Sequence, residues 1–293
     1  MLTLGLLAAL STAVLFTVSQ LIAKKVTPVL GMRKTSLIVV GVGIIPMLIA
    51  FVLLPVPELS TVQLLTVVLG GVFLGLGYFG YYKSVESQQI SNVAGVDLIQ
   101  PVAIAIFGIF FLGESINAPQ FVGALAVFIG ILFISTHKEG RKPNWSLLPA
   151  LLGNVSWAIY WIILSPIIIK TNQFALPLLL SRTVATIVAV LGFFLMFGKV
   201  KQKKTARAGG SLKRLLLFIV VLGIIEALFD SSGNITFGVA VVSNYLALGA
   251  VITCLCPVMI ALCAHFIYRE RLTLIQACGI VLATLGALAI AMF

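Results

Sequence analysis

The chain has 293 residues, of which 61% are hydrophobic and only 9% are charged, and its mean hydropathy is +1.20. This composition excludes an ordinary soluble domain, because such domains contain about 25% charged residues. The net charge of +11 does not indicate a nucleic-acid partner, because 17 of the 19 Lys and Arg residues lie at one set of alternating loops or helix ends.

Hydrophobic runs between polar breaks predict the helices in chain order. A helix needs about 20 apolar residues to cross a bilayer. Ten runs fit this description: residues 2–23, 35–54, 62–84, 92–112, 118–136, 147–168, 174–197, 213–237, 242–268 and 273–292. They are too long and too numerous for the strands of a membrane barrel, which would alternate with a period of two. The predicted fold class is an all-α integral membrane protein with ten transmembrane helices.

The placement of the basic residues predicts the orientation in the membrane. Short loops rich in Lys and Arg stay in the cytoplasm, so we expect the basic side, including the loop 199–214, to be cytoplasmic. Met1 and Phe293 then lie outside, since neither end carries a basic side chain nearby. The expected location is the plasma membrane, with the lipid bilayer as partner and no role for nucleic acid.

The chain contains an internal duplication. Residues 101–134 align without gaps with residues 257–290, at a constant offset of 156. The coinciding pairs are Pro101/Pro257, Glu114/Glu270, Gln120/Gln276, Gly123/Gly279 and Gly130/Gly286. Five helices per repeat is an odd number, so the two halves would cross the membrane in opposite directions as inverted repeats. We expect the first repeat over residues 1–138 and the second over 147–293.

The same residues carry a family resemblance. Two five-helix repeats, each with the frame Pro-x12-Glu-x5-Gln-x2-Gly-x6-Gly over its last two spans, resemble the drug/metabolite transporter superfamily, in particular its EamA-type members. The segments Asp230-x3-Asn234 and Gly153-Asn-Val-Ser-Trp157 add to the likeness. The resemblance implies a carrier that works by alternating access, with the first, third, fourth, sixth, eighth and ninth helices around a cavity. It implies no single substrate, because members move amino acids, sugars, amines, nucleotides and drugs.

Ionisable residues at membrane depth are the first candidates for a site. Each costs at least about 2.5 kcal/mol at the centre of a helix unless it is paired or faces water. Glu226, Asp230 and Asn234 are spaced four apart and therefore share one helical face. Arg182 lies at a similar depth in the preceding span. Arg182 either forms a structural ion pair with one of the carboxylates or binds a substrate carboxylate, and a carboxylate left unpaired could bind an ammonium group or a proton.

The two carboxylates are not part of the duplication. At the offset of 156, Gly70 and Leu74 stand opposite Glu226 and Asp230. The fold therefore does not need a carboxylate at these positions, which favours a specialised role. We predict Asp230 to be the most important residue of the site.

A polar and aromatic cluster is expected in the sixth span. Asn154, Trp157 and Trp161 are spaced three and four apart and share a face, and Tyr160 shares that face with Trp157. Trp and Tyr normally favour the headgroup region, so their position inside the membrane indicates a lined cavity, although packing alone is the alternative. Aromatic faces beside carboxylates suit an ammonium group.

Gates or helix breaks are predicted beside the two matching prolines, because proline frees a carbonyl one turn back along the helix. The residues concerned are Asp97, Gln100, Pro101 and Pro257. Tyr78 and Tyr82 share a face of the third helix and could close the cavity from the cytoplasmic side.

Other motifs indicate neither a cofactor nor an enzyme. Gly75-Leu-Gly-Tyr-Phe-Gly80 matches the dinucleotide fingerprint, which requires a preceding strand and an aqueous helix start. Inside a membrane helix the same glycines permit close helix packing. The four cysteines and two histidines form no metal-ligand spacing, and hydrolase motifs are missing from the sequence. We expect no metal, no cofactor and no catalytic activity.

The sequence therefore predicts a secondary active transporter for a small polar metabolite. An amino acid, an amine or a related zwitterion is the expected substrate, export the expected direction, and a proton the candidate coupling ion. The alternatives are an uptake carrier for a sugar or a choline-like solute, and a flippase for a polar-headed lipid. We expect a monomer or a weak homodimer.

Overall fold

The computed structural model describes residues 2–86, 88, 90, 93, 96–97, 99–114, 116–134, 147–195, 210–243, 245–267 and 274–292. In chain order its helices are α1 (Leu2–Leu30), α2 (Met32–Val42), α3 (Ile44–Leu53), α4 (Thr61–Val85), α6 (Ile99–Phe111), α7 (Ala118–Ile134), α8 (Leu148–Thr171), α9 (Ala175–Leu195), α10 (Gly210–Val242), α11 (Leu246–Thr253), α12 (Leu255–Ile267) and α13 (Leu274–Met292). Within these ranges the chain forms no strand.

Seven helical segments of the described chain are long and apolar enough to cross a membrane. They are Leu4–Leu30, Met32–Leu53, Thr61–Val85, Leu148–Thr171, Ala175–Leu195, Arg214–Val242 and Leu246–Ile267. Three further apolar helices are shorter: Ile99–Phe111, Ala118–Gly130 and Ala277–Gly286. The predicted all-α membrane fold is therefore present, with seven segments of spanning length where ten were expected.

The molecule exposes many large apolar side chains, while four acidic or basic side chains are buried inside it: Asp97, Arg182, Glu226 and Asp230. Phe110 is 77% exposed and Leu195 is 82% exposed, whereas Arg182 and Glu226 are completely buried. In water this distribution would be unfavourable, because apolar surface is costly to hydrate. In a bilayer it is the expected one, and it agrees with a multi-pass membrane protein.

Two helices extend beyond the spans predicted from hydropathy. α1 continues to Leu30, past Lys24 and Lys25, and α10 begins at Gly210, inside the segment predicted as a loop. Lys and Arg have high helix propensity, so a helix can continue beyond its apolar part. Hydropathy therefore reports the apolar part of each helix and not its ends. The rest of the predicted basic loop, residues 199–209, lies outside the described residues.

Prolines accompany three interruptions of the helices. Pro101 and Pro257 are each the third residue of a helix, α6 and α12. Pro46 is likewise the third residue of α3, and α2 ends four residues before it, next to Gly43. Proline cannot donate a backbone hydrogen bond and its ring clashes with the carbonyl four residues earlier. The span predicted as one helix over 35–54 is therefore two helices joined at Gly43.

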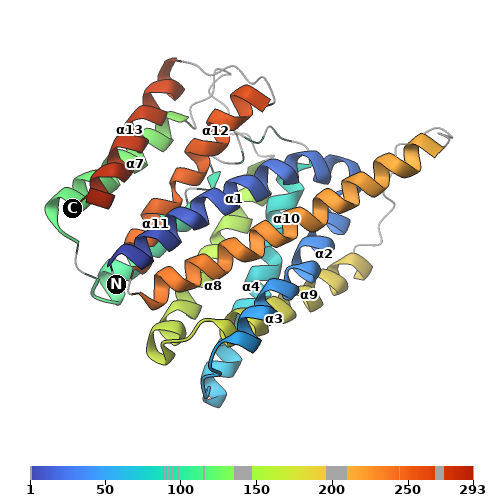
Figure 1. Cartoon of the computed structure of the whole chain (residues 1–293), viewed down its shortest axis with the longest axis horizontal. Coiled ribbons are helices and arrows are strands. Elements are labelled where there is room, and N and C mark those ends of the chain that lie inside the picture. The colour runs from blue at the N-terminus through green and yellow to red at the C-terminus, as the bar shows by residue number, and fades with distance from the viewer. Residues whose placement is uncertain are drawn as a thin grey trace.

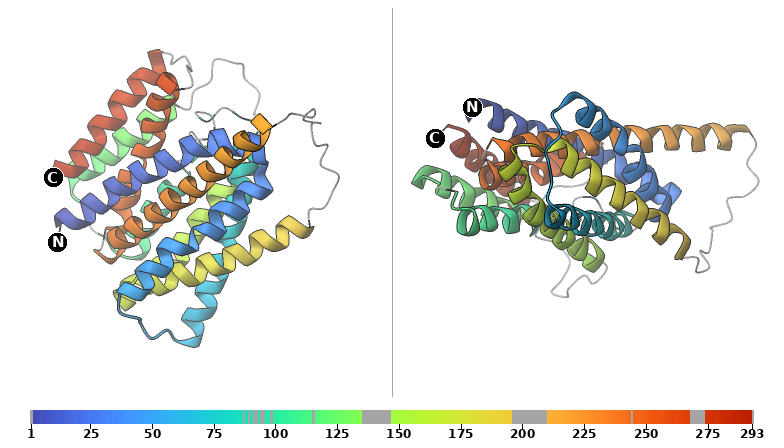
Figure 2. Two further views of the ribbon diagram at one scale, coloured as in Figure 1. Left: turned by 45° about the vertical axis from the view of Figure 1, so that its right-hand side comes forward. Right: turned by 90° about the horizontal axis from the view of Figure 1, so that it is seen from below.

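The long helices lie side by side across the molecule. α1 packs along α10, α4 packs along α8, and α7 pairs with α13 at one edge of the bundle (Figure 1). The start of α1 and the end of α13 lie at the same end of the molecule (Figure 2). The polar residues considered below belong to the group of helices around α4, α8 and α10.

The α7–α13 pair is held by backbone contact at glycines of the duplicated frame. A Cβ atom added at Gly130 would lie 2.5 Å from the Gly279 carbonyl oxygen, and one at Gly286 would lie 2.8 Å from the Val127 amide nitrogen and closer still to the Gly123 carbonyl oxygen. Residues 123 and 130 of α7 thus meet 286 and 279 of α13, so the two helices are antiparallel. Any larger side chain would separate the two backbones.

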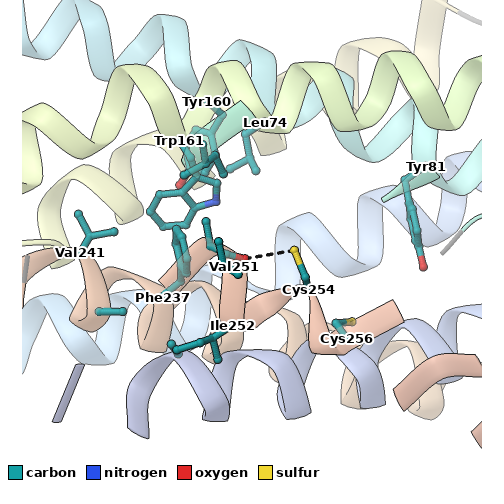
Figure 3. Packing of buried hydrophobic residues seen from close by; sticks show 14 of the residues in the cluster. Leu74, Tyr81, Tyr160, Trp161, Phe237, Val241, Val251, Ile252, Cys254 and Cys256 are labelled. Carbon is teal, nitrogen blue, oxygen red and sulfur yellow. Dashed lines mark hydrogen bonds between the residues drawn. The ribbon is translucent and has the colours of Figure 1, made fainter. Parts of the chain in front are cut away.

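The core and the polar region are continuous. The Trp161 and Phe237 rings meet edge to face, with 4.5 Å between their centroids, and Val251 and Ile252 of α11 lie next to them (Figure 3). Cys254 donates a hydrogen bond of 3.6 Å to the Ala250 carbonyl oxygen, close to the interruption between α11 and α12. α11 therefore supports the aromatic residues of the site from behind.

Candidate functional site

A cavity lies between five helices, α1, α4, α6, α8 and α10. Its walls consist of Phe16, Ser19, Gln20, Leu74, Tyr78, Tyr81, Tyr82, Gln100, Trp157, Trp161, Asp230 and Asn234. Most of this surface is aromatic or amide, and Asp230 is the ionisable carboxylate among these lining residues. The ninth helix of the resemblance, which corresponds to α11 and α12, supplies none of them.

Asp230 is held in a buried ion pair. The Nη2 atom of Arg182 lies 2.8 Å from Asp230 Oδ2, and the Tyr78 hydroxyl donates a hydrogen bond of 2.6 Å to the same oxygen. Arg182 also donates to the Tyr78 hydroxyl, and its guanidinium carbon lies 4.9 Å from the centre of the Tyr78 ring. Arg182 is fully buried, while 9% of Asp230 remains exposed. The sequence left two roles open for Arg182, a structural ion pair and the binding of a substrate carboxylate. The structure shows the ion pair.

The interruption between α2 and α3 makes room for this arginine. Arg182 Nη2 donates to the Val39 carbonyl oxygen at 2.8 Å, and its Nε donates to the Val40 carbonyl oxygen at 3.1 Å. A Cβ atom at Gly43 would overlap with Arg182 and with Ser231 of α10. These hydrogen bonds join α9 to α2, α4 and α10 and fix the position of Asp230.

Glu226 lies one turn before Asp230 and has a different environment. The Tyr82 hydroxyl donates a hydrogen bond of 2.6 Å to Glu226 Oε1. The other carboxyl oxygen, Oε2, is buried without a hydrogen-bond partner in the part of the chain that the structure describes. The carboxyl group is completely buried and does not line the cavity, whereas Tyr82 does.

Tyr78 and Tyr82 of α4 therefore hold the two carboxylates of α10. The order is reversed along the two helices, because 78 binds 230 and 82 binds 226. The two tyrosine rings are stacked, with 6.1 Å between their centroids. The sequence placed these tyrosines on one face as cavity-closing residues, and it did not indicate that they bind the carboxylates.

The tryptophans form the opposite aromatic wall. Trp157 lies 5.2 Å from Tyr78 and 5.3 Å from Tyr81, measured between ring centroids. Its indole nitrogen is buried without a hydrogen-bond partner in the described chain. Trp161 packs on Phe237, and Asn234 donates from its amide to the Asp230 backbone carbonyl at 2.9 Å. The wall thus presents aromatic rings to the cavity, while the Trp157 indole nitrogen packs against Gly77 of α4.

A second polar cluster lies behind the cavity. Asn154 Nδ2 donates a hydrogen bond of 2.8 Å to Asp97 Oδ1, and the Gln20 amide lies beside the same carboxyl group. Asp97 Oδ2 and Asn154 Oδ1 are buried without partners in the described chain. This cluster joins α1, α8 and the residues just before α6.

The structure places the predicted substrate-binding residues in two groups. Tyr78, Trp157, Trp161, Asp230 and Asn234 line the cavity, as does Gln100 from the predicted gate. Asn154, Tyr160, Arg182 and Glu226 were expected to contact the substrate, but they are buried behind the wall. The Tyr160 hydroxyl faces the Ser181 hydroxyl at 3.3 Å instead. Helical spacing predicts which residues of one helix share a face. It does not distinguish the residues of the cavity wall from those buried behind the wall.

Five cavity residues were not predicted: Phe16, Ser19, Gln20, Leu74 and Tyr81. Two of them left a signal in the sequence. Gln20 is a polar residue inside an apolar run, and Phe16 is the first-repeat counterpart of Trp157. Ser19 and Leu74 are unremarkable in a membrane helix, so no sequence pattern distinguishes them.

Glu114 binds the N-terminal end of α11 through its carboxylate group. Its two carboxylate oxygens accept hydrogen bonds from the backbone amides of Leu246, at 3.0 Å, and Ala247, at 2.7 Å. Partial burial raises the pKa of the Glu114 carboxyl group above its ordinary value, and the two amide bonds oppose this shift. A carboxylate at a helix N-terminus satisfies amides that have no partner within the helix. The duplicated partner, Glu270, lies outside the described residues.

Among the described residues, no three His, Cys, Asp or Glu side chains gather as a metal site would require. A helical bundle with an apolar surface thus encloses an aromatic cavity that contains one accessible carboxylate. These features define a multi-pass membrane protein with a polar and aromatic cavity between its helices.

The EamA-like transporter family matches residues 1–136 and 144–292, so the chain belongs to this family of transporters. It is 28% identical over 145 residues to an "Uncharacterized transporter" of Clostridium kluyveri, an alignment that covers 48% of this chain and 46% of that protein. It is 30% identical over 67 residues to the "Uncharacterized transporter in cobO 3'region" of Sinorhizobium sp, which covers 23% of this chain and 48% of that protein. The chain therefore matches about half the length of each of these curated relatives.

The fold also resembles that of a solved crystal structure. The TM-score is 0.67, with 19% sequence identity and 98% of both chains covered. This likeness concerns the fold alone.

Proposed function

We propose that this transporter is a secondary active carrier that moves a small organic cation or zwitterion, such as an amine or an amino acid, across the cell membrane. The observation that carries the proposal is the partly exposed Asp230 carboxylate in a wall of aromatic rings. An ammonium group is attracted both to a carboxylate and to the faces of Trp and Tyr rings. Arg182 leaves part of this carboxylate available, because it binds Oδ2.

The proposed mechanism is alternating access between two inverted repeats, residues 1–138 and 147–293, with ten spans in total. Two features support it. α6 and α12 begin and end at residues that differ by 156 at both ends. The glycine contacts between the antiparallel α7 and α13 form two equivalent pairs, since Gly130 meets Gly279 and Gly286 meets Gly123. Replacing each glycine by its counterpart in the other half gives the same two pairs. Such exchange is typical of a two-fold axis perpendicular to the helices.

The proposed orientation has the basic loops in the cytoplasm of the cell and both termini outside, and we propose export as the direction. The test is labelling of single cysteines by a membrane-impermeant reagent, in a chain whose exposed Cys278 is replaced by Ser. A cysteine at Thr3 should react in intact cells, while a cysteine at Gly209 should react only after lysis. The opposite pattern would reverse the orientation.

The substrate class can be tested by intrinsic fluorescence. Two of the three tryptophans, Trp157 and Trp161, line the cavity. In a Trp145→Phe background, purified protein is titrated with amines, amino acids, choline, sugars and phospholipid headgroups. We expect a saturable change of fluorescence with ligands that carry an ammonium group. A response to sugars alone would overturn the proposal and favour a sugar carrier, and a response to lipid headgroups alone would favour a flippase.

Replacement of one aromatic wall residue sharpens this test. Trp157→Ala removes a ring face and should weaken ammonium binding by roughly 3- to 30-fold, which corresponds to the usual range of cation–π energies. Leu195→Ala is the matched control, because Leu195 is 82% exposed on the outer surface. It should leave the dissociation constant unchanged. Equal effects of the two replacements would contradict a site at Trp157.

A further inference from the structure

Glu226 is a buried carboxyl group without a cation to pair with. The described residues contain two ion pairs, Arg182–Asp230 and Lys83–Glu86. Glu226 belongs to neither, it is completely buried, and its Oε2 atom has no hydrogen-bond partner there. An ionised carboxylate in such a position would be an excess negative charge inside an apolar bundle. A bound proton removes that charge.

The charged and titratable groups on the neighbouring helices do not change this conclusion. α4 presents the Tyr82 and Tyr81 hydroxyls, and the Asp230 carboxylate lies one turn away on α10 itself. α9 contributes Arg182, whose charge is paired with Asp230. α8 contributes the Tyr160 hydroxyl, which faces Ser181.

The remaining helices packed against α10 form no ion pair with Glu226 in the described chain. α3 and α11 contain no titratable residue. The basic residues of α1 and α2 are Lys24, Lys25, Arg33 and Lys34, and none forms an ion pair with Glu226 within the described ranges. Lys24 donates to the Gln88 carbonyl oxygen. One turn before Glu226, at Gly223, α1 and α2 present the apolar residues Val26 and Ile38.

A route for a proton connects Glu226 with the cavity. Tyr82 lines the cavity, and its hydroxyl group is hydrogen-bonded to Glu226 Oε1 at 2.6 Å. The hydroxyl can pass its proton to the carboxylate and take up another proton from the cavity side. One O–H bond breaks and one forms at Tyr82, and the carboxylate gains one proton.

We propose that Glu226 is the proton-binding site that couples this carrier to the proton gradient, separate from the substrate carboxylate Asp230. The proposal rests on the proposed carrier function and names its coupling ion. The two carboxylates are one helical turn apart and are linked through the stacked rings of Tyr82 and Tyr78. A cationic substrate at Asp230 disfavours the proton at Glu226, and the proton disfavours the substrate, because both introduce positive charge into the same buried region.

Asp97 is the competing buried carboxylate. It also lacks a cation partner in the described chain, but two amides surround it, and 7% of it is exposed. Its hydrogen-bond donors stabilise an ionised carboxylate better than the single phenol at Glu226 does. The experiment therefore includes both carboxylates.

The first measurement follows ligand binding as a function of pH, with the ammonium ligand identified by fluorescence as the probe. For the parent protein we expect the dissociation constant to change by up to about tenfold per pH unit over part of the range, as linkage to one proton requires. Glu226→Gln keeps the shape and the Tyr82 contact, and should make the dissociation constant independent of pH. In proteoliposomes it should lose accumulation driven by a pH gradient while it retains exchange of labelled for unlabelled substrate.

Tyrosine variants give a matched comparison. Tyr82→Phe removes the hydroxyl that contacts Glu226, and we expect it to alter the pH dependence or slow the approach to proton equilibrium. Tyr81→Phe removes a neighbouring hydroxyl that has no hydrogen-bond partner in the described chain. It should keep the parent's pH dependence, whatever its transport rate. Parent-like pH dependence in both Glu226→Gln and Tyr82→Phe would overturn the proposal, as would loss of the dependence in Asp97→Asn alone.

A second measurement needs no substrate and separates this proposal from the carrier function. Infrared spectra of the purified protein in H2O and D2O should contain the C=O stretch of a protonated carboxyl group, and this band should disappear in Glu226→Gln. If the band disappears but no ligand of any class binds, the carrier function fails and the proton site stands. A band that is absent from the parent at neutral pH, or unchanged in Glu226→Gln, overturns the proton site by itself.

Discussion

The α7–α13 pair and the cavity between α4, α8 and α10 follow different rules of construction. α7 and α13 meet through glycines that occur in both halves of the sequence, and the contacts of one half repeat those of the other. The residues around the cavity differ in type between the two halves, since Leu74 stands opposite Asp230 and Phe16 stands opposite Trp157. The cavity is therefore asymmetric, although it lies between helices of both halves.

This difference separates scaffold from site. A duplicated residue must suit two places in the molecule, which favours general packing functions such as a glycine in a close helix contact. A residue present in one half alone can be specialised, as are Arg182 and the two carboxylates of α10. Equivalent replacements in α7 and α13 should therefore lower the stability by similar amounts, whereas replacements around the cavity should have effects that differ between the two halves.

The largest effect is expected from Asp230→Asn. The sequence by itself suggested that this variant would fold normally, but the structure contains a buried Arg182 that would lose its counter-charge. Removing one partner of a buried pair costs about 3–5 kcal/mol of folding free energy. Thermal unfolding of the purified protein should show a clearly lower midpoint. The double variant Arg182→Met with Asp230→Asn should recover part of the loss, and a midpoint of Asp230→Asn within about 2 °C of the parent would contradict the ion pair.

The glycine contacts should give the next largest effect. Gly130→Ala and Gly286→Ala each place a methyl group against backbone atoms of the partner helix, which cannot move independently. We expect each to destabilise the protein by about 2–3 kcal/mol, and by similar amounts. Gly249→Ala is the control, because the atom nearest to its added Cβ lies 3.5 Å away. A neutral Gly286→Ala beside a destabilising Gly130→Ala would show that the two contacts are not equivalent.

A third pair of variants tests the asymmetric side of the comparison. Gly43→Ala would place a methyl group against Arg182, Ser231 and the Val39 carbonyl oxygen, whereas the atom nearest to a Cβ at Gly41 lies 3.9 Å away. We expect Gly43→Ala to lower the stability by about 1–2 kcal/mol and Gly41→Ala to change it little. The loss should become smaller in an Arg182→Met background. If the loss is unchanged there, the overlaps with Ser231 and the Val39 carbonyl account for it and Arg182 does not.

The smallest effect is expected at Glu114. Glu114→Gln keeps an acceptor for one α11 amide and removes the cost of a partly buried charge, so the two changes oppose each other and the net effect should stay below about 1 kcal/mol. Because burial raises the pKa of Glu114, the parent should lose a small amount of stability as the pH rises through that raised pKa. Unfolding midpoints over a series of pH values should show this loss in the parent and not in Glu114→Gln. A parent that gains stability over that interval would reverse the sign.

Prediction from the sequence was most successful where a pattern depends on the bilayer. The apolar runs gave the helices, because a membrane span needs a minimum length of apolar side chains. The proline near the start of α6 and its counterpart in α12 were visible as a repeat. Pro46 was not singled out, because it has no counterpart in the duplicated frame, and the interruption at Gly43 was therefore missed.

The candidate site was predicted in part. Four-residue spacing predicted one shared face for Glu226, Asp230 and Asn234 of α10, and the last two of these line the cavity. Of the aromatic residues predicted to share a face of α8, Trp157 and Trp161 line the cavity, whereas Tyr160 faces Ser181. Spacing along one helix could not predict the hydrogen-bond partners of these carboxylates. Tyr78 and Tyr82 lie on another helix, 152 and 144 residues away in the sequence.

The sequence by itself determined the membrane class, the helical fold, the duplication and the family, because each of these follows from residue type and order along one dimension. Only the tertiary structure decided which carboxylate Arg182 neutralises, which residues reach the cavity and which stand behind them. Helical periodicity fixes the face of a side chain but not the neighbour that this face meets. That neighbour depends on how the helices pack. At this site the packing pairs Asp230 with Arg182, and within the described chain it gives Glu226 the Tyr82 hydroxyl as its hydrogen-bond partner.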